Sequence, residues 1–240
     1  MNNDPLNLFV IPGPMSMLKN DINIIDKNGL NFVMGPDGRP LRFTPWLGDS
    51  LSFLYDLIME KSIFPRKFGG DITRHYDILR RELKNVHGKR VLELATGSGS
   101  AVNFLGSDNV YVGTDISPGL LRKAMKRFST TGFTSAEFYV ASADDLPFDD
   151  AVFEVCLCLL SLNFFTDLAK VAHELNRILA SGSVFLCAVP VPERNTQGSK
   201  IRGTLYSEDE LIRIFRGNGF MYERIPSDNG TLLYFKGIKE

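Results

Sequence analysis

The feature that most constrains the fold is an alternation of short apolar runs and stretches with helical spacing between residues 91 and 189. The segment that begins at Ser117 carries Pro118 in its first turn, which is typical of a helix start. Repeated β-α units imply a parallel sheet with helices on both faces. The sequence therefore predicts an α/β, doubly wound fold whose first five strands are 91–95, 110–114, 138–141, 153–158 and 184–189.

The chain also carries predicted elements on either side of this repeat. Helical spacing precedes it from about residue 51 and again over 71–86, with a loop expected at 64–70. After it, Ser207 and Glu210 have capping-box spacing at the start of a helix. Two strands then follow, joined by a turn-rich connection, and a terminal hairpin would make one strand antiparallel. These last strands are 220–225 and 232–238.

The first 48 residues differ from the rest because prolines and glycines interrupt them. Short apolar stretches are separated by Asn28-Gly29 and by Pro36-Asp37-Gly38, both of which are turn signals. We expect residues 1–48 to form an N-terminal extension with a β-hairpin arm, and residues 49–240 to form the main domain. The arm could cover a site, mediate a homodimer or pad the surface.

Composition limits the classes of function that remain. The 240 residues include 27 Lys and Arg against 28 Asp and Glu, so no global basic field favours nucleic acid as a partner. The longest apolar run, 155–165, is shorter than the ~20 residues of a membrane span, and the N-terminus has no secretory signal. The cysteines lie in apolar runs without a C-x-x-C pair, which favours a cytoplasmic protein with reduced thiols and no metal site: Cys156, Cys158 and Cys187.

A glycine-containing loop follows the first predicted strand of the repeat. Gly97-Ser98-Gly99 would allow a tight turn and close backbone approach to a ligand. Val102 stands where a dinucleotide fingerprint needs its third glycine. Glu93 lies inside the apolar strand, and a buried charge is costly unless it has partners. Glu93 could bind a ligand, or it could simply accept hydrogen bonds from the loop.

Two further loops are expected at the same edge of the sheet. Asp115 lies 18 residues after Gly97, at the tip of the second strand, where an acid can accept from a ribose diol or cap a helix. The acidic segment 142–150 follows the third strand. The three loops would converge at the carboxyl ends of adjacent strands, which is the usual ligand crevice of an open α/β sheet.

As a set, these motifs resemble the class I S-adenosylmethionine-dependent methyltransferases, especially the small-molecule type similar to the ubiquinone and menaquinone C-methyltransferases. The resemblance rests on residues 91–99, 113–121, 142–148 and Glu174–Leu179, and it runs from about Leu54 to the C-terminus. It implies a Rossmann-like, mostly parallel seven-stranded sheet with a C-terminal antiparallel hairpin. It also implies S-adenosylmethionine as cofactor, S-adenosylhomocysteine as product, and a small-molecule methyl acceptor.

The resemblance assigns roles to individual positions. Gly97, Gly99 and the backbone near Ala95 would hold the methionine part, Asp115 the ribose hydroxyls, and Ile116 the adenine. The Ala143 N–H would meet the adenine with Ser142 or Asp144 beside it, because Ser142 replaces an acid that the family often has there. The implied cofactor-binding set is Glu93, Ala95, Thr96, Gly97, Gly99, Asp115, Ile116, Leu120, Ser142, Ala143, Asp144 and Leu159.

Weaker candidates could contact the acceptor, each with a plain packing or loop role as the alternative: Tyr55, Arg74, Tyr76, Ser161 and Asn163. His75 is read as a surface or core residue. The sequence offers no convincing general base, so alignment and desolvation would carry the reaction. No Asn-Pro-Pro-Tyr follows the fourth strand and no Pro-Cys loop is present, which argues against amino methylation of adenine or glutamine and against covalent pyrimidine methylation. A binding protein without transferase activity and an NAD(P)-dependent oxidoreductase remain alternatives.

Overall fold

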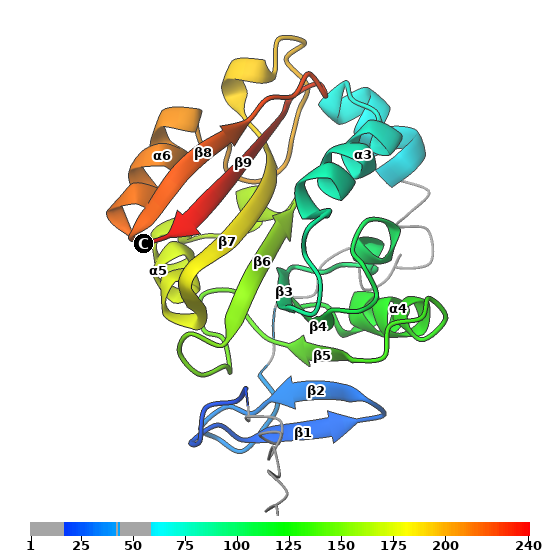
Figure 1. Ribbon diagram of the computed structural model, residues 1–240, viewed down its shortest axis with the longest axis vertical. Coiled ribbons are helices and arrows are strands. Elements are labelled where there is room, and N and C mark those ends of the chain that lie inside the picture. The colour runs from blue at the N-terminus through cyan, green and yellow to red at the C-terminus, as the bar shows by residue number, and fades with distance from the viewer. Residues whose placement is uncertain (1–16, 42, 44–58) are drawn as a thin grey trace, which may run out of the picture.

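The computed structural model (Figure 1) describes residues 17–41, 43 and 59–240. Its centre is a nine-stranded sheet with the order β1-β2-β5-β4-β3-β6-β7-β9-β8. Neighbouring strands from β2 to β7 run parallel, whereas the outer pairs β1·β2, β7·β9 and β8·β9 are antiparallel. The strands are β1 (Ile24–Lys27), β2 (Leu30–Val33), β3 (Arg90–Leu94), β4 (Val110–Asp115), β5 (Ala136–Val140), β6 (Phe153–Leu159), β7 (Leu179–Pro190), β8 (Phe220–Ile225) and β9 (Leu232–Lys239).

Helices cover both faces of this sheet, which confirms the doubly wound α/β fold. Side chains alternate along each strand, so Val91 packs in one apolar cluster with α3 and α4, whereas Leu92 packs in another with α5 and α6. The helices and helical turns are η2 (Met59–Phe68), α3 (Ile72–Leu83), η3 (Ser100–Asn103), α4 (Pro118–Phe128), η4 (Leu162–Phe164), α5 (Leu168–Ile178), η5 (Pro192–Arg194) and α6 (Glu208–Gly217).

The C-terminal hairpin and the helix before it are confirmed. The Ser207 hydroxyl accepts from the Glu210 N–H at 3.2 Å, and the Glu210 carboxylate accepts from the Ser207 N–H at 2.7 Å. This capping box satisfies backbone donors that the first turn of α6 leaves free. Strand β9 then lies antiparallel between β7 and β8.

The expected strand count was wrong, since the sheet has nine strands rather than seven. The two additional strands form a hairpin that turns at Asn28 and Gly29, both with positive φ. Strand β2 pairs in parallel with β5, and Leu30 is fully buried in the cluster that contains Phe138. Burial of Leu30 at the outer side of β5 explains why the hairpin extends the sheet (Figure 1).

Two local expectations were also wrong. Residues 64–68, expected as a loop, continue the helical turn η2 because Phe64 and Phe68 pack in the buried cluster beneath it. The segment after Gly99, where the β-α repeat implies a helix, holds only the 3₁₀ turn η3. The helix predicted from residue 51 lies mostly outside the described residues. No helix in the described part of the chain is long and apolar enough to cross a bilayer.

Candidate functional site

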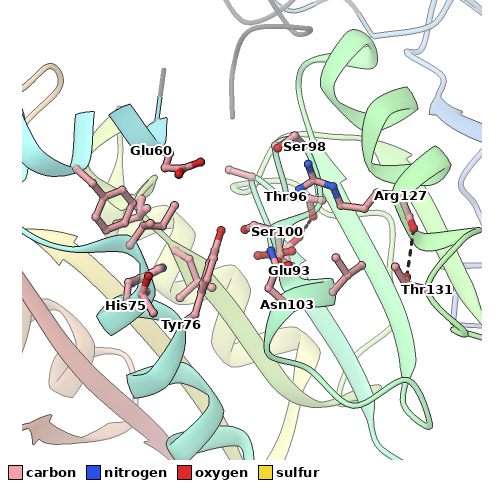
Figure 2. A pocket seen from close by; sticks show the side chains of 18 residues that line it. Glu60, His75, Tyr76, Glu93, Thr96, Ser98, Ser100, Asn103, Arg127 and Thr131 are labelled. Atoms are coloured by element: carbon pink, nitrogen blue, oxygen red, sulfur yellow. Dashed lines mark hydrogen bonds between the residues drawn. The ribbon is translucent and has the colours of Figure 1, made fainter. Parts of the chain in front are cut away.

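Two adjoining cavities lie at the carboxyl ends of the central strands. The first, about 590 Å³, separates α3 from the loop after β3, and we call it the His75 cavity (Figure 2). The second, about 550 Å³, lies over the ends of β4 and β5, and we call it the Asp115 cavity. Four residues line both cavities, so the two spaces meet there: Ala95, Gly97, Leu159 and Leu160. This is the edge at which an open α/β sheet binds ligands.

The loop after β3 makes the junction by turning sharply. Ala95 has φ 50° and Gly97 has φ 57°, both in the left-handed region. Gly99 has φ 80°, and a Cβ there would lie 2.9 Å from Cα of Ala124 on α4. Gly99 thus allows close packing of the loop on α4, whereas Gly97 itself borders both cavities.

Asp115 at the end of β4 braces this loop. Its Oδ2 accepts from the Gly97 N–H and its Oδ1 accepts from the Ser117 N–H, each at 2.9 Å. A carboxylate oxygen can accept more than one hydrogen bond. Asp115 is buried, and its neighbour Ile116 leaves 41% of its surface exposed beside the same cavity. A polar acceptor pair next to an uncovered apolar side chain suits a sugar that carries a flat heterocycle.

Ser142 and Asp144, which the sequence offers as alternatives for one role, are joined by a hydrogen bond. The Ser142 hydroxyl donates to the Asp144 carboxylate, which also lies 3.3 Å from the Lys170 ammonium. The Ser142 hydrogen bond, together with Lys170, holds the pKa of Asp144 below its usual value despite partial burial. The ionised Asp144 therefore orients the Ser142 hydroxyl at the wall of the Asp115 cavity.

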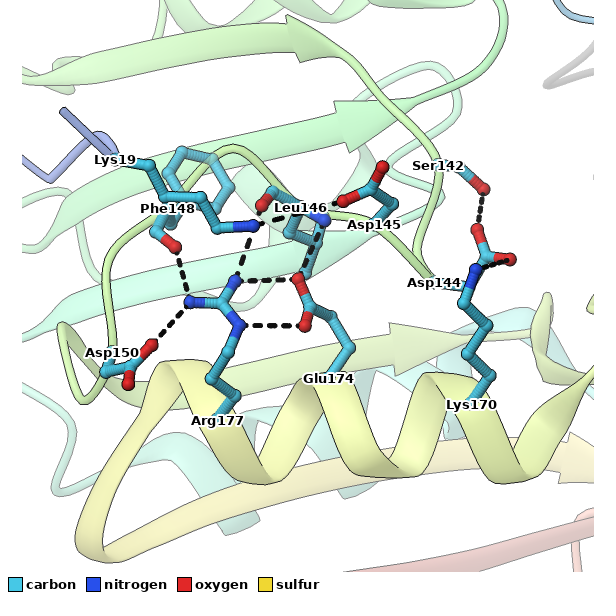
Figure 3. Close-up of polar contacts among 10 residues, drawn as sticks. All are labelled: Lys19, Ser142, Asp144, Asp145, Leu146, Phe148, Asp150, Lys170, Glu174 and Arg177. Carbon is cyan, nitrogen blue, oxygen red and sulfur yellow. Dashed lines mark hydrogen bonds and ion pairs between the residues drawn. The ribbon is translucent and has the colours of Figure 1, made fainter. Parts of the chain in front are cut away.

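The loop that carries Ser142 is fixed from below by α5 (Figure 3). Glu174 accepts from the Leu146 N–H at 2.8 Å and forms two hydrogen bonds with the Arg177 guanidinium, at 2.7 and 2.8 Å. Arg177 also donates to the Phe148 carbonyl at 2.7 Å and to the Asp150 carboxylate at 2.7 Å. This network explains the Glu174–Leu179 motif, because the two charged side chains hold the loop after β5.

A buried carboxyl group is among the residues that line the His75 cavity. Glu93 is 3% exposed and accepts a hydrogen bond from the Tyr111 hydroxyl on the neighbouring strand. Burial raises the pKa of Glu93 to about 8, the Tyr111 hydrogen bond opposes that rise, and the nearby Asp115 charge adds to it. The raised pKa favours the protonated carboxyl group of Glu93, and a cation bound nearby would favour its ionised form.

Most of the predicted cofactor residues line the two cavities. The His75 cavity is lined by Glu93, Ala95, Thr96, Gly97 and Leu159, and also by Tyr76 from the acceptor set. The Asp115 cavity is lined by Ala95, Gly97, Asp115, Ile116, Leu120, Ser142, Ala143, Asp144 and Leu159, and also by Ser161 from the acceptor set.

Three predicted residues line neither cavity. Gly99 packs on α4, and Arg74 forms an ion pair with Asp228 at 3.1 Å. The Asn163 amide donates to the Arg202 carbonyl at 2.6 Å, which connects η4 to the segment before α6. Tyr55 lies outside the described residues.

Sequence reasoning missed Tyr111, which donates a hydrogen bond to a residue of the His75 cavity, and three residues that line the cavities themselves. Tyr111 was read only as a strand residue, although Tyr111 and Glu93 lie on adjacent parallel strands and face the same side of the sheet. Arg127, at the end of α4, lines the His75 cavity. Phe164, the last residue of η4, and Phe165, which follows it, line the Asp115 cavity. The register of β3 and β4 could have identified Tyr111, but nothing in the sequence marked the others.

The described residues show no arrangement for metal binding. No group of three or more His, Cys, Asp or Glu side chains in residues 17–41, 43 and 59–240 is placed to hold an ion. The cysteines are free and buried. Burial raises the pKa of the Cys156 and Cys187 thiols well above the usual value, so both remain protonated.

Residues 92–187 match the methyltransferase domain family. Among curated proteins, demethylmenaquinone methyltransferase of Chlorobaculum tepidum is 28% identical over 153 residues, which are 62% of this chain and 61% of that protein. The enzyme of the same name from Clavibacter sepedonicus is 32% identical over 114 residues, which are 47% of this chain and 46% of that protein. The matches thus cover about half to three fifths of these relatives.

Solved structures share the fold. The YcgJ protein of Bacillus subtilis superposes with a TM-score of 0.60 at 18% identity, covering 69% of this chain and 99% of that one. A putative methyltransferase of Haloferax volcanii, solved with the Trm112 methyltransferase activator, gives 0.60 at 22% identity, covering 79% and 97%. Residues 92–187 are therefore similar to methyltransferases in sequence, and the chain shares its fold with these solved structures.

Proposed function

We propose that this protein transfers the methyl group of S-adenosylmethionine to a small-molecule acceptor and releases S-adenosylhomocysteine. The observation that carries the proposal is the pair of cavities that meet at Ala95, Gly97, Leu159 and Leu160. One cavity has the polar and apolar groups that suit a nucleoside, and the other leaves room for an acceptor next to it.

The Asp115 cavity would hold the adenosine part. Asp115 would accept from the ribose hydroxyls, and Ile116 would cover the adenine. The Ser142 hydroxyl and the Ala143 N–H would meet the edge of the base. These roles are supported by the lining of the cavity and by the brace that Asp115 makes with the loop after β3.

The donor's sulfonium makes its methyl carbon electrophilic without help from the protein. The task of this chain is therefore to place the acceptor in line and to exclude water, which can supply up to roughly 7–11 kcal/mol in ideal systems. Leu159 and Leu160 form an apolar boundary where the two cavities join. Glu93 would face the cationic end of the donor and ionise in response to it.

The acceptor is proposed to be a ring that carries oxygen. The two relatives described above are named for methylation of demethylmenaquinone, a ring that carries oxygen. Apolar side chains on both cavities would suit such an acceptor, including Phe64, Tyr76 and Phe164.

The test is formation of S-adenosylhomocysteine, measured by mass spectrometry, with S-adenosylmethionine and a panel of quinols, phenols, amines and tRNA. We expect turnover with at least one quinol or phenol and its loss in Asp115→Ala. Tight S-adenosylhomocysteine binding without turnover across the panel would favour a non-enzymatic binding role. Binding of NAD but not of S-adenosylhomocysteine would favour an oxidoreductase.

We further propose a cytoplasmic location and a homodimer that forms through the N-terminal extension. The first proposal is supported by the buried free thiols of Cys156, Cys158 and Cys187. The second is supported by β1, whose outer edge ends the described sheet and could pair with a second copy. Light scattering of the full chain and of Ile25→Pro tests the dimer, which we expect the proline to dissociate.

A further inference from the structure

His75 is a buried polar residue in the wall of the His75 cavity. It lies on α3, is 2% exposed and lines the cavity together with Tyr76 (Figure 2). Its ring lies 5.3 Å from the Phe64 ring and 5.7 Å from the Tyr76 ring, centroid to centroid. Aromatic packing on both neighbours thus fixes the orientation of the imidazole.

A chain of hydrogen bonds leads from the backbone of Asp71 to the His75 ring. It begins at a backbone N–H, which can only donate, and a backbone carbonyl, which can only accept. The Asp71 N–H donates to Asn229 Oδ1 at 2.7 Å, and Asn229 Nδ2 donates to the Asp71 carbonyl at 3.0 Å. These two bonds define which side of the Asn229 amide carries oxygen. Asn229 Nδ2 therefore also acts as the donor to the Tyr234 hydroxyl oxygen, at 3.0 Å.

The same logic fixes the proton on His75. The Tyr234 oxygen accepts from Asn229, so its own hydrogen is available for His75 Nδ1, which lies 2.8 Å away. Nδ1 is then the acceptor. Burial lowers the pKa of His75 to about 3, which keeps the ring neutral. A neutral imidazole that accepts at Nδ1 carries its proton on Nε2.

Nε2–H is the one polar group of this chain of contacts that is left without a partner. No hydrogen bond to His75 Nε2 exists among residues 17–41, 43 and 59–240, and His75 is one of the residues that line the cavity of about 590 Å³. Building on the proposed function, we propose that His75 presents a fixed Nε2–H donor to the methyl acceptor and selects acceptors with a carbonyl, phenol or phenolate oxygen. An ammonium or an apolar edge offers no lone pair to this donor.

Two ligands of one shape test this selectivity. 2,3-Dimethyl-1,4-naphthoquinone carries two carbonyl oxygens and cannot add a thiol at its substituted carbons, whereas 2,3-dimethylnaphthalene lacks the oxygens. Their affinities are measured by fluorescence titration, with and without S-adenosylhomocysteine. We expect His75→Leu to weaken quinone binding about 2- to 12-fold, the effect of one hydrogen bond, and to leave naphthalene binding unchanged.

His75→Gln is the conservative variant, since its amide N–H can lie near the position of Nε2–H. We expect His75→Gln to retain most of the quinone affinity. Tyr234→Phe frees Nδ1 without removing the ring, so it should weaken quinone binding by less than His75→Leu does. Long-range ¹H–¹⁵N NMR of the wild-type protein should show His75 protonated at Nε2 only, and Tyr234→Phe should mix the two tautomers.

Different results would overturn the role of His75 and the proposed methyl transfer. An Nδ1-protonated ring, equal losses for quinone and naphthalene, or no quinone binding by the wild-type protein would each overturn the role of His75. Failure of S-adenosylhomocysteine to bind would instead contradict the proposed function, and it leaves the tautomer and the ligand pair as separate measurements.

Discussion

Because the carboxyl group of Glu93 is buried, we expect the free energy of unfolding to fall as the pH rises through the neutral range. A group whose pKa is higher in the folded than in the unfolded state stabilises the fold at low pH, and that contribution is lost as pH rises. For Glu93 the loss extends from the ordinary value of 4.5 up to about 8. Between pH 6 and pH 8, this single group should lower the free energy of unfolding by about 2 kcal/mol.

Glu93→Gln removes the titration while keeping the shape of the protonated acid and an oxygen that can accept from Tyr111. Urea unfolding of both proteins at pH 6 and pH 8 isolates the effect, because other titrating groups are common to both. From pH 6 to pH 8, we expect the free energy of unfolding of Glu93→Gln to rise by about 2 kcal/mol relative to that of the wild-type protein.

Glu174→Gln is the control, because the pKa of Glu174 is shifted in the opposite direction to that of Glu93. Hydrogen bonds and charge from Arg177 outweigh burial and hold the pKa of Glu174 below its usual value. Its stabilisation is therefore present at neutral pH and lost only as the medium becomes acidic. The difference between Glu174→Gln and the wild-type protein should be constant from pH 6 to pH 8. Parallel curves for Glu93→Gln as well would refute the raised pKa of Glu93.

Two further substitutions probe the loops of the site. Arg177→Ala leaves Glu174 buried without its cation, and breaking a buried ion pair is expensive, so we expect the free energy of unfolding in urea to fall by about 2–4 kcal/mol. The control is Arg216→Ala, at an exposed position of α6. Equal losses for the two variants would contradict the stabilising role of the Arg177 network. Gly99→Ala places a methyl 2.9 Å from Cα of Ala124 and should cost about 1–3 kcal/mol more than Gly182→Ala, a position of similar positive φ with nothing within 4 Å. Equal costs for the two glycines would show that the contact with α4 is unimportant.

The parts of the fold that could be predicted are those set by local periodicity and caps. The strand 153–158 and the helix that begins after Ser117 follow from apolar spacing and a capping residue, and both are present. The pairing of Leu30 beside Phe138 could not be predicted, because it joins segments about a hundred residues apart. Long-range pairing depends on which edge remains free after the rest of the sheet has formed.

The candidate site divides in the same way. Asp115 and Gly97 were expected close together because consecutive parallel strands end at one edge, and a hydrogen bond joins them. The hydrogen bond from Tyr111 to Glu93 depends on the register of two strands, and the tautomer of His75 depends on a chain that ends at Asn229. These contacts join residues from separate elements, so they could be identified only from the three-dimensional structure. The ligand roles of all these residues remain predictions.

The most direct test of the central claim is calorimetric titration of S-adenosylhomocysteine into the wild-type protein and Asp115→Ala. Hydrogen bonds to a charged group contribute about 1.5–3 kcal/mol, so we expect a loss of affinity of about 10- to 150-fold. The control is Asp145→Ala, which removes a largely exposed acid from the loop after β5. We expect this variant to bind S-adenosylhomocysteine as tightly as the wild-type protein does. Equal affinity for the wild-type protein and Asp115→Ala, or no binding by the wild-type protein, would contradict the assignment of this crevice.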